Sequence, residues 1–111
     1  AYVTLNDPVY VEAAQALGRR LVSEGGTTTD ERIRFGLKLV LAREATQFQI
    51  DELKRLYESE VTHYRTAEKD AAKLATEPIG ALPPGLSAEE AAAWTVVANV
   101  LLNLDGVLTR G

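Results

Sequence analysis

The sequence contains no cysteine and only one histidine among its 111 residues. Without cysteine, disulfide bonds and thiolate metal sites are excluded. Glu60 and His63 have the spacing that places a carboxylate and an imidazole on one helical face. A helical di-metal site needs two such motifs and further carboxylates. The sequence also lacks a recognisable nucleophile with a neighbouring base. These absences predict no metal, no cofactor and no catalysis by this chain alone.

The chain also lacks an excess of basic residues, since 12 basic and 16 acidic residues give a net charge of −4. Nucleic-acid binding depends on neutralising phosphates with lysine and arginine, so this balance argues against it. The first residues, Ala1 to Leu5, contain neither the charged nor the apolar region of a signal peptide. No apolar run reaches the roughly 20 residues that a membrane span needs. We expect neither a nucleic-acid partner nor a membrane span.

What the chain does contain is typical of a folded globular protein. Hydrophobic residues make up 46% and charged residues 25% of the sequence, which are ordinary proportions for such proteins. A chain of this length can form one stable hydrophobic core without disulfide bonds or bound metal ions. We therefore expect a single helical domain over residues 1–111. The first residue is not methionine, which hints at a processed or excised fragment.

Helix-start signals recur along the chain, and apolar residues at three- and four-residue spacing follow each of them. Asp7-Pro8 is typical of an N-cap and a first helical residue, and Gly25-Gly26 of the end of that helix. Three capping boxes follow, in the pairs Thr28 with Glu31, Thr46 with Gln49, and Ser87 with Glu90. The pattern predicts an all-α fold, a compact array of four to five helices with mostly antiparallel neighbours.

The expected helix bounds follow from these signals. The first helix is Val9–Glu24, and the second begins at Thr28 and has its body at Arg32–Arg43. The third runs from Thr46 to about Tyr64. A loop at Thr76–Leu86, rich in proline and glycine, precedes the last helix, which runs from Ser87 to about Leu108. Apolar residues surround nearly the whole second helix, so we expect it to be the central, most buried one. A buried strand over Leu37–Ala42 is the alternative. The pattern leaves open whether Thr66–Ala75 continues the third helix.

The last helix is apolar on almost every side between Ala91 and Leu104, and it carries the single tryptophan, Trp94. Such a helix is either buried on several sides or meets a partner. Asn103 and Asp105 fall where the pattern expects burial. We therefore expect them to hydrogen-bond backbone groups of a neighbouring loop or helix end. Contact with a ligand is the alternative.

Six of the twelve basic residues lie in the first two predicted helices, including the adjacent Arg19 and Arg20. A helix-turn-helix DNA reader would also need net positive charge and base-reading side chains, which the sequence does not offer. Ion pairing within the chain, such as Asp30 with Arg34, is one interpretation. A regulatory surface around Arg19 and Arg20 is another, and its partner binding would weaken with salt.

Short strings spread over the whole chain also form an ordered set. They are Leu5–Pro8, Val11–Ala14, Arg32–Phe35, Leu41–Arg43, Thr46, His63–Arg65, Ala93–Thr95 and Leu101–Asp105. This set resembles a C-terminal domain of unknown function found in large multi-domain proteins of planctomycete bacteria. Two positions depart from the pattern of that family. Ala45 stands where proline is usual, and Gly106-Val107 replaces an acidic-aromatic pair.

The resemblance implies the C-terminal part of a longer, exported or periplasmic protein, in a family that commonly carries an upstream cytochrome-c-like segment. It supplies no activity or catalytic residue. We expect a non-catalytic structural or interaction module of an exported, redox-associated protein. Its partners would be upstream segments of its parent chain, another protein or a second copy. The alternative is a ligand-binding or accessory domain of a carbohydrate-processing enzyme. The candidate positions are Trp94, Asn103, Asp105, Arg19 and Arg20, with Tyr64 added under the alternative.

Overall fold

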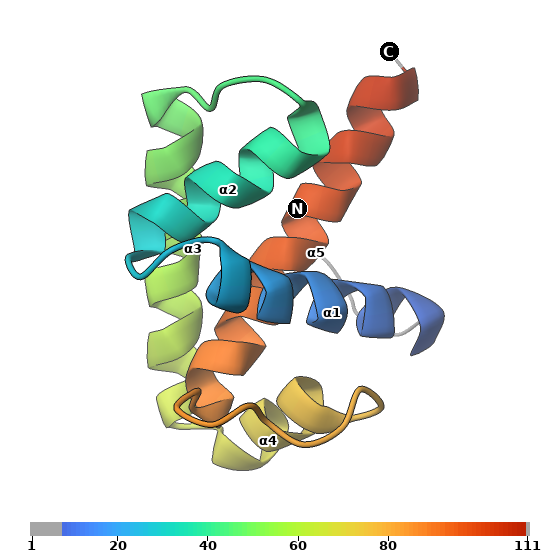
Figure 1. Cartoon of the computed structure of the whole chain (residues 1–111). Coiled ribbons are helices and arrows are strands. Elements are labelled where there is room, and N and C mark those ends of the chain that lie inside the picture. The colour runs from blue at the N-terminus through green and yellow to red at the C-terminus, as the bar shows by residue number, and fades with distance from the viewer. Residues whose placement is uncertain (1–7, 111) are drawn as a thin grey trace.

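The fold consists of helices joined by loops, of which the loop between Thr76 and Ala88 is the longest in the described range (Figure 1). The computed structural model describes the backbone of residues 8–110 and the side chains of residues 11–104. In this range the helices are α1 (Pro8–Glu24), α2 (Thr29–Leu41), α3 (Gln47–Arg65), α4 (Glu68–Thr76) and α5 (Ala88–Arg110). The predicted all-α fold of four to five helices is confirmed. The alternative of a strand over 37–42 is wrong, because helix α2 continues to Leu41.

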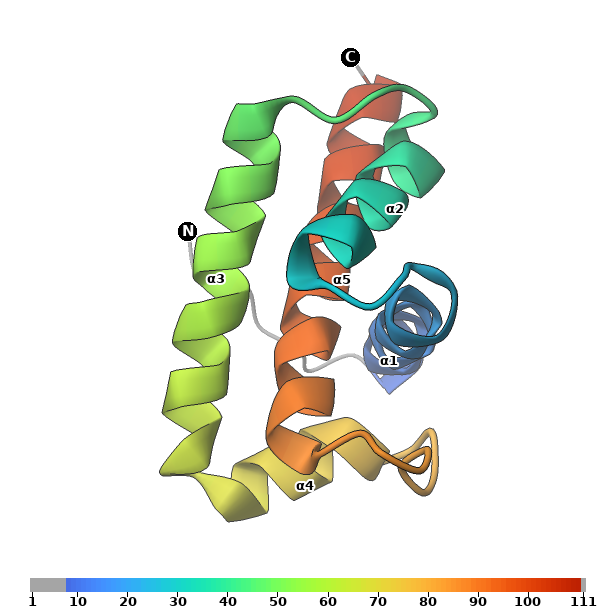
Figure 2. The ribbon, with the colours of Figure 1, turned by 60° about the vertical axis from the view of Figure 1, so that its left-hand side comes forward.

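The last helix, α5, is the central one and contacts each of the other four. α3 lies beside α5 and runs in the opposite direction, whereas α1 and α4 lie across it (Figures 1 and 2). The prediction that the second helix is the most buried is wrong. α2 fully buries only Ile33, Gly36 and Leu37, and its Leu39 is 41% exposed. The apolar surface of α5 is therefore largely covered within the chain itself.

The main hydrophobic core lies between α5 and one face each of α1, α2 and α3. Its buried members are Leu21, Ile33, Leu37, Ile50, Leu53, Trp94, Val97 and Leu101. At the crossing of α1 and α5, a Cβ on Gly18 would lie 3.1 Å from the carbonyl carbon and oxygen of Trp94. The two backbones approach this closely because Gly18 has no side chain, and the crossing holds Trp94 at the centre of the molecule.

The capping boxes form as the sequence predicts. The Thr28 hydroxyl accepts from the Glu31 backbone N–H at 3.1 Å, and the Glu31 carboxylate accepts from the Thr28 N–H at the same distance. Thr46 and Gln49 make the equivalent pair at the start of α3. Asp7, the predicted cap of α1, lies outside the described residues. These side chains satisfy backbone donors that a helix start leaves without partners.

The sequence left the structure of residues 66–75 open. The helical path breaks at Thr66 and Ala67, and the chain then forms the separate short helix α4. Ala67 stands at the N-cap and supplies no side-chain hydrogen bond. α4 buries Ala71 and Ala75, and the loop after it leads to Ser87 at the start of α5.

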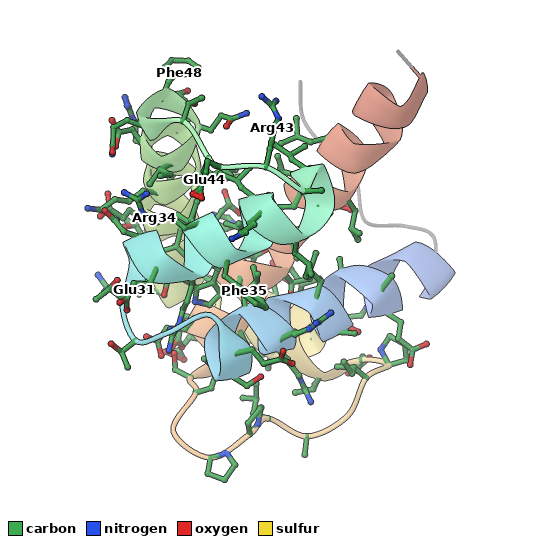
Figure 3. The ribbon with its side chains drawn as sticks, turned by 45° about the horizontal axis from the view of Figure 1, so that its top comes forward. Glu31, Arg34, Phe35, Arg43, Glu44 and Phe48 are labelled. Atoms are coloured by element: carbon green, nitrogen blue, oxygen red, sulfur yellow. The ribbon has the colours of Figure 1, made fainter. Side chains whose placement is uncertain are left out.

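The outer surface of α2 and α3 is mostly charged. Asp30 pairs with Lys54 of α3 at 3.3 Å rather than with the predicted Arg34, which is exposed. Figure 3 shows Phe48 projecting from the start of α3, where its side chain is 73% exposed. Among the described residues, no helix combines the length and the apolar character needed to cross a membrane.

Candidate functional site

A groove of about 440 Å³ lies between the second half of α3 and the start of α5. The α3 side chains that line it are Tyr57, Glu58, Val61, Thr62 and Arg65, and the α5 side contributes Ser87, Glu89 and Glu90. The α3 residues recur at helical spacing, so they form one continuous face of that helix. Because α3 and α5 run antiparallel, the end of α3 meets the beginning of α5 at this place.

The α5 side of the groove is shaped by the third capping box. The Ser87 hydroxyl accepts from the Glu90 N–H at 3.2 Å. The Glu90 carboxylate accepts from the Ser87 N–H at 3.3 Å and from its hydroxyl at 3.0 Å. These bonds hold both side chains in place, and carboxylates in the first turn are favoured by the helix dipole.

Tyr57 forms the aromatic part of the groove and packs against Trp94. Their ring centroids are 4.3 Å apart, with planes inclined by 32°. Burial raises the pKa of Tyr57 above its ordinary value, and the negative charge of Glu90 raises it further, while the positive charge of Arg32 lowers it. The phenol therefore stays protonated at neutral pH and keeps its hydrogen-bond donor.

Trp94 itself is buried, with only 1% of its surface exposed. The guanidinium of Arg32 lies 5.9 Å from its ring centroid, and its indole nitrogen has no hydrogen-bond partner. Trp94 is thus placed behind Tyr57 rather than in the groove. Under the alternative of a ligand-binding domain, contact of Trp94 with a ligand would require movement of the core.

The charges around the groove are unbalanced. Three carboxylates (Glu58, Glu89 and Glu90) and one guanidinium (Arg65) line it, which gives a net charge of −2. None of the ion pairs found between described residues involves Glu58, Glu89 or Arg65. The groove therefore presents negative charge that the described part of the chain does not neutralise by ion pairing.

The structure separates the two arginines that the sequence analysis took together. Arg19 is half-buried and donates through Nη2 to the carbonyls of Ala75 at 3.0 Å and Gly80 at 2.6 Å. Arg20 is exposed, pairs with Glu24 at 3.2 Å, and lies 5.9 Å from the Phe35 ring centroid. Arg19 is thus engaged inside the fold and does not form a free basic surface with Arg20.

The polar residues of α5 are also arranged differently from the prediction. Asn103 is exposed, and its amide donates to the carbonyl of Asn99 one turn earlier at 2.9 Å. The expectation that Asn103 is buried against a neighbouring loop or helix end is therefore wrong. The side chain of Asp105 lies outside the described residues. The buried asparagine is Asn99, at 0% exposure.

The two remaining candidates do not reach the groove. His63 is exposed and stands edge-on to Tyr64, with ring centroids 4.8 Å apart, and Tyr64 is not among the residues that line the groove. No group of three or more histidine, aspartate or glutamate side chains within the described range could hold a metal ion. The arrangement supplies hydrogen bonds, charge and an aromatic surface, which are means of binding.

The sequence predicts the two helical segments that line the groove, but it does not predict that they lie against each other. The sequence predicts a third helix from Thr46 to about Tyr64, which contains the groove residue Tyr57, and a capping box of Ser87 with Glu90. No sequence signal shows that these two segments face each other, since that depends on how α3 packs on α5. Gln15 and Asn99 were missed as buried polar residues because each lies within an apolar helical pattern.

Comparison with known proteins identified no relative of this chain. No protein-family model, no curated protein and no solved structure matches the chain.

Proposed function

We propose that this chain is a non-catalytic interaction module that binds a positively charged polypeptide segment in the groove between α3 and α5. The observation that carries this proposal is the net charge of −2 around a groove of about 440 Å³. Opposite charge on a partner would steer its approach and fix its register. The segment would belong to another protein or to the longer chain that the family resemblance implies, in an exported, redox-associated protein.

The groove offers a specific set of contacts to such a segment. Glu58 on α3 and Glu89 on α5 stand on opposite sides of it and would pair with lysine or arginine side chains. Tyr57 would cover an apolar or cationic side chain with its ring. Val61 adds an apolar surface between the charged positions. This combination suits a short segment in which basic and apolar residues alternate.

The proposal is tested by titrating the chain with short peptides that alternate lysine or arginine with apolar residues. Trp94 is the single tryptophan and packs on Tyr57, so its fluorescence reports on occupancy of the groove. We expect a saturable change with basic peptides and none with peptides of the same length in which glutamate replaces the basic residues. The binding should weaken as the salt concentration rises.

Substitutions then locate the binding. Glu58→Gln or Glu89→Gln should each weaken it by about 2- to 5-fold, the effect of losing one partly exposed ion pair. Glu60→Gln is the matched control, because it removes the same charge from α3 two residues away and outside the groove. If no basic peptide binds, or if Glu60→Gln weakens binding as much as Glu58→Gln, the groove is not the interaction site.

The alternative of a sugar-binding domain receives support from Tyr57, since an aromatic ring beside carboxylates is a usual surface for hydroxylated ligands. The hydroxyls of Thr62 and Ser87, which line the groove, are already engaged. Thr62 donates to the Glu58 carbonyl at 3.0 Å, and Ser87 donates to Glu90. We therefore favour the peptide. A fluorescence response to a panel of mono- and disaccharides, abolished by Tyr57→Leu, would reverse this preference.

A further inference from the structure

The segment formed by α4 and its two connections, residues 66–86, begins and ends at the groove. Arg65 precedes it and Ser87 follows it, and both residues line the groove. We call this stretch the α4 segment. Its position across one end of α5 is seen in Figures 1 and 2. Any movement of the α4 segment therefore acts on one residue from each side of the groove.

The α4 segment buries few apolar side chains completely. Its fully buried side chains are Ala71 and Ala75, and no residue of α4 belongs to the main hydrophobic core or packs against it as a partly buried hydrophobic. Its larger apolar side chains, Leu74, Ile79, Leu82 and Leu86, are only half-buried. Because hydrophobic stabilisation scales with the apolar area removed from water, the segment is held less tightly than the core.

Two side chains of α1 provide the other attachment. The Gln15 amide donates to the carbonyls of Leu74 and Glu77, and the Arg19 guanidinium donates to those of Ala75 and Gly80. The last carbonyls of a helix have no partner within the helix. The Gln15–Arg19 pair thus satisfies the end of α4 and the loop after it.

This attachment is incomplete. The Oε1 atom of Gln15 and the Nε atom of Arg19 are buried without a hydrogen-bond partner. A buried polar atom without a partner disfavours the closed arrangement, because water would satisfy the same atom after opening. The α4 segment therefore combines apolar contacts without fully buried large side chains with a polar contact that is only partly satisfied.

We infer that the α4 segment opens as a unit while the remaining four helices stay folded, and that the Gln15–Arg19 pair controls this opening. Local opening of elements with few buried apolar contacts is a general property of proteins. Opening frees Arg65 and Ser87 from their fixed separation and so changes the shape of the groove. Its role in binding rests on the proposed function, whereas the opening itself does not.

Hydrogen exchange of the full chain, followed for each amide by NMR, tests the inference. We expect the amides of residues 72–77 to exchange at least about 10-fold faster than those of core positions in α3 and α5. Arg19→Met, which keeps the apolar stem and removes the donors, should raise exchange in the α4 segment by a further factor of about 10. It should leave the core amides unchanged. The matched control is Arg20→Met, which alters the exposed neighbour that bonds Glu24.

Two results would overturn the inference. One is equal exchange of the α4 segment and the core in the unsubstituted chain, which would mean that α4 opens only when the whole chain unfolds. This comparison stands even if Arg19→Met fails to fold. The other is a uniform increase over all helices in Arg19→Met. Because neither measurement uses a peptide, failure of the groove to bind one leaves the inference about the α4 segment standing.

Discussion

Asn99 in α5 is a single residue that lowers the stability of the fold. Its side chain is fully buried, and neither its amide oxygen nor its amide nitrogen has a hydrogen-bond partner. Burying a polar group without a partner costs free energy, because the group loses its hydrogen bonds to water. Gln15 and Arg19 each leave one atom in the same condition, but Nε2 of Gln15 and Nη2 of Arg19 are bonded. Asn99 is the most unfavourable of the three.

Replacing Asn99 with leucine should therefore stabilise the chain. The two side chains have similar shapes, and the change removes two unsatisfied polar atoms. We expect the free energy of unfolding to rise by about 1–3 kcal/mol, measured by urea denaturation. Asn103→Leu, one turn later on the exposed side of α5, is the control and should change it by no more than about 0.5 kcal/mol. A loss of stability in Asn99→Leu would show that the amide makes a favourable interaction.

At the scale of the elements, α2 and α3 both begin with a capping box that has threonine at the N-cap, but the reciprocal partner of the threonine differs. α2 uses Glu31 as the reciprocal partner, whereas α3 uses Gln49. The backbone N–H groups of Thr27 and then Thr28, followed by the Thr28 side chain, hold the pKa of Glu31 below its ordinary value of 4.5. A depressed pKa means that the folded chain binds fewer protons than the unfolded chain in this pH range.

The cap of α2 should therefore lose stability in acid, whereas that of α3 should not. The contribution of Glu31 is fully present above its unfolded pKa and disappears as the pH falls through the lowered folded value. We expect Glu31→Gln to flatten the acid side of the stability curve, measured by urea denaturation between about pH 3 and pH 6. Gln49→Glu should steepen it. Identical curves for all three proteins would contradict this assignment.

The starts of α2, α3 and α5 could be predicted from sequence because a capping box acts over three residues. The start of α4 could not, since Ala67 at its N-cap makes no side-chain bond. The end of α2 was placed two residues too late. The helix stops at Leu41 because Ala42 adopts a left-handed conformation with φ of 55°, which alanine does not signal. Local chemistry thus determined the predictable boundaries, and the others depend on packing.

At the scale of the whole molecule, the order of burial could not be predicted from the apolar count of each helix. α2 carries large apolar residues around most of its circumference, yet it lies at the outside. α5 is central because its alanines at positions 91–93 allow neighbouring helices to approach, and Gly18 lets α1 come closest. Which helices meet is a property of the assembled chain. For the same reason the groove could not be predicted from the sequence, because it exists only where α3 and α5 lie side by side.

Central burial of α5 leads to a prediction about the size of the molecule in solution. Since the four other helices cover α5, we expect the isolated chain to be a monomer with a cooperative melt. Light scattering coupled to size exclusion should give a mass near 12.1 kDa. Twice that mass would mean that a surface of the chain, such as the one around the exposed Phe48, forms an interface between copies.

The central claim is that the groove between α3 and α5 binds a basic polypeptide segment. Its most direct test is the mapping of backbone amide shifts in the full chain while an alternating basic and apolar peptide is added. The account predicts saturable shifts concentrated at Tyr57, Glu58, Arg65, Ser87 and Glu89, with the exposed face of α2 unchanged. Shifts concentrated elsewhere, or none at saturating peptide, would contradict it.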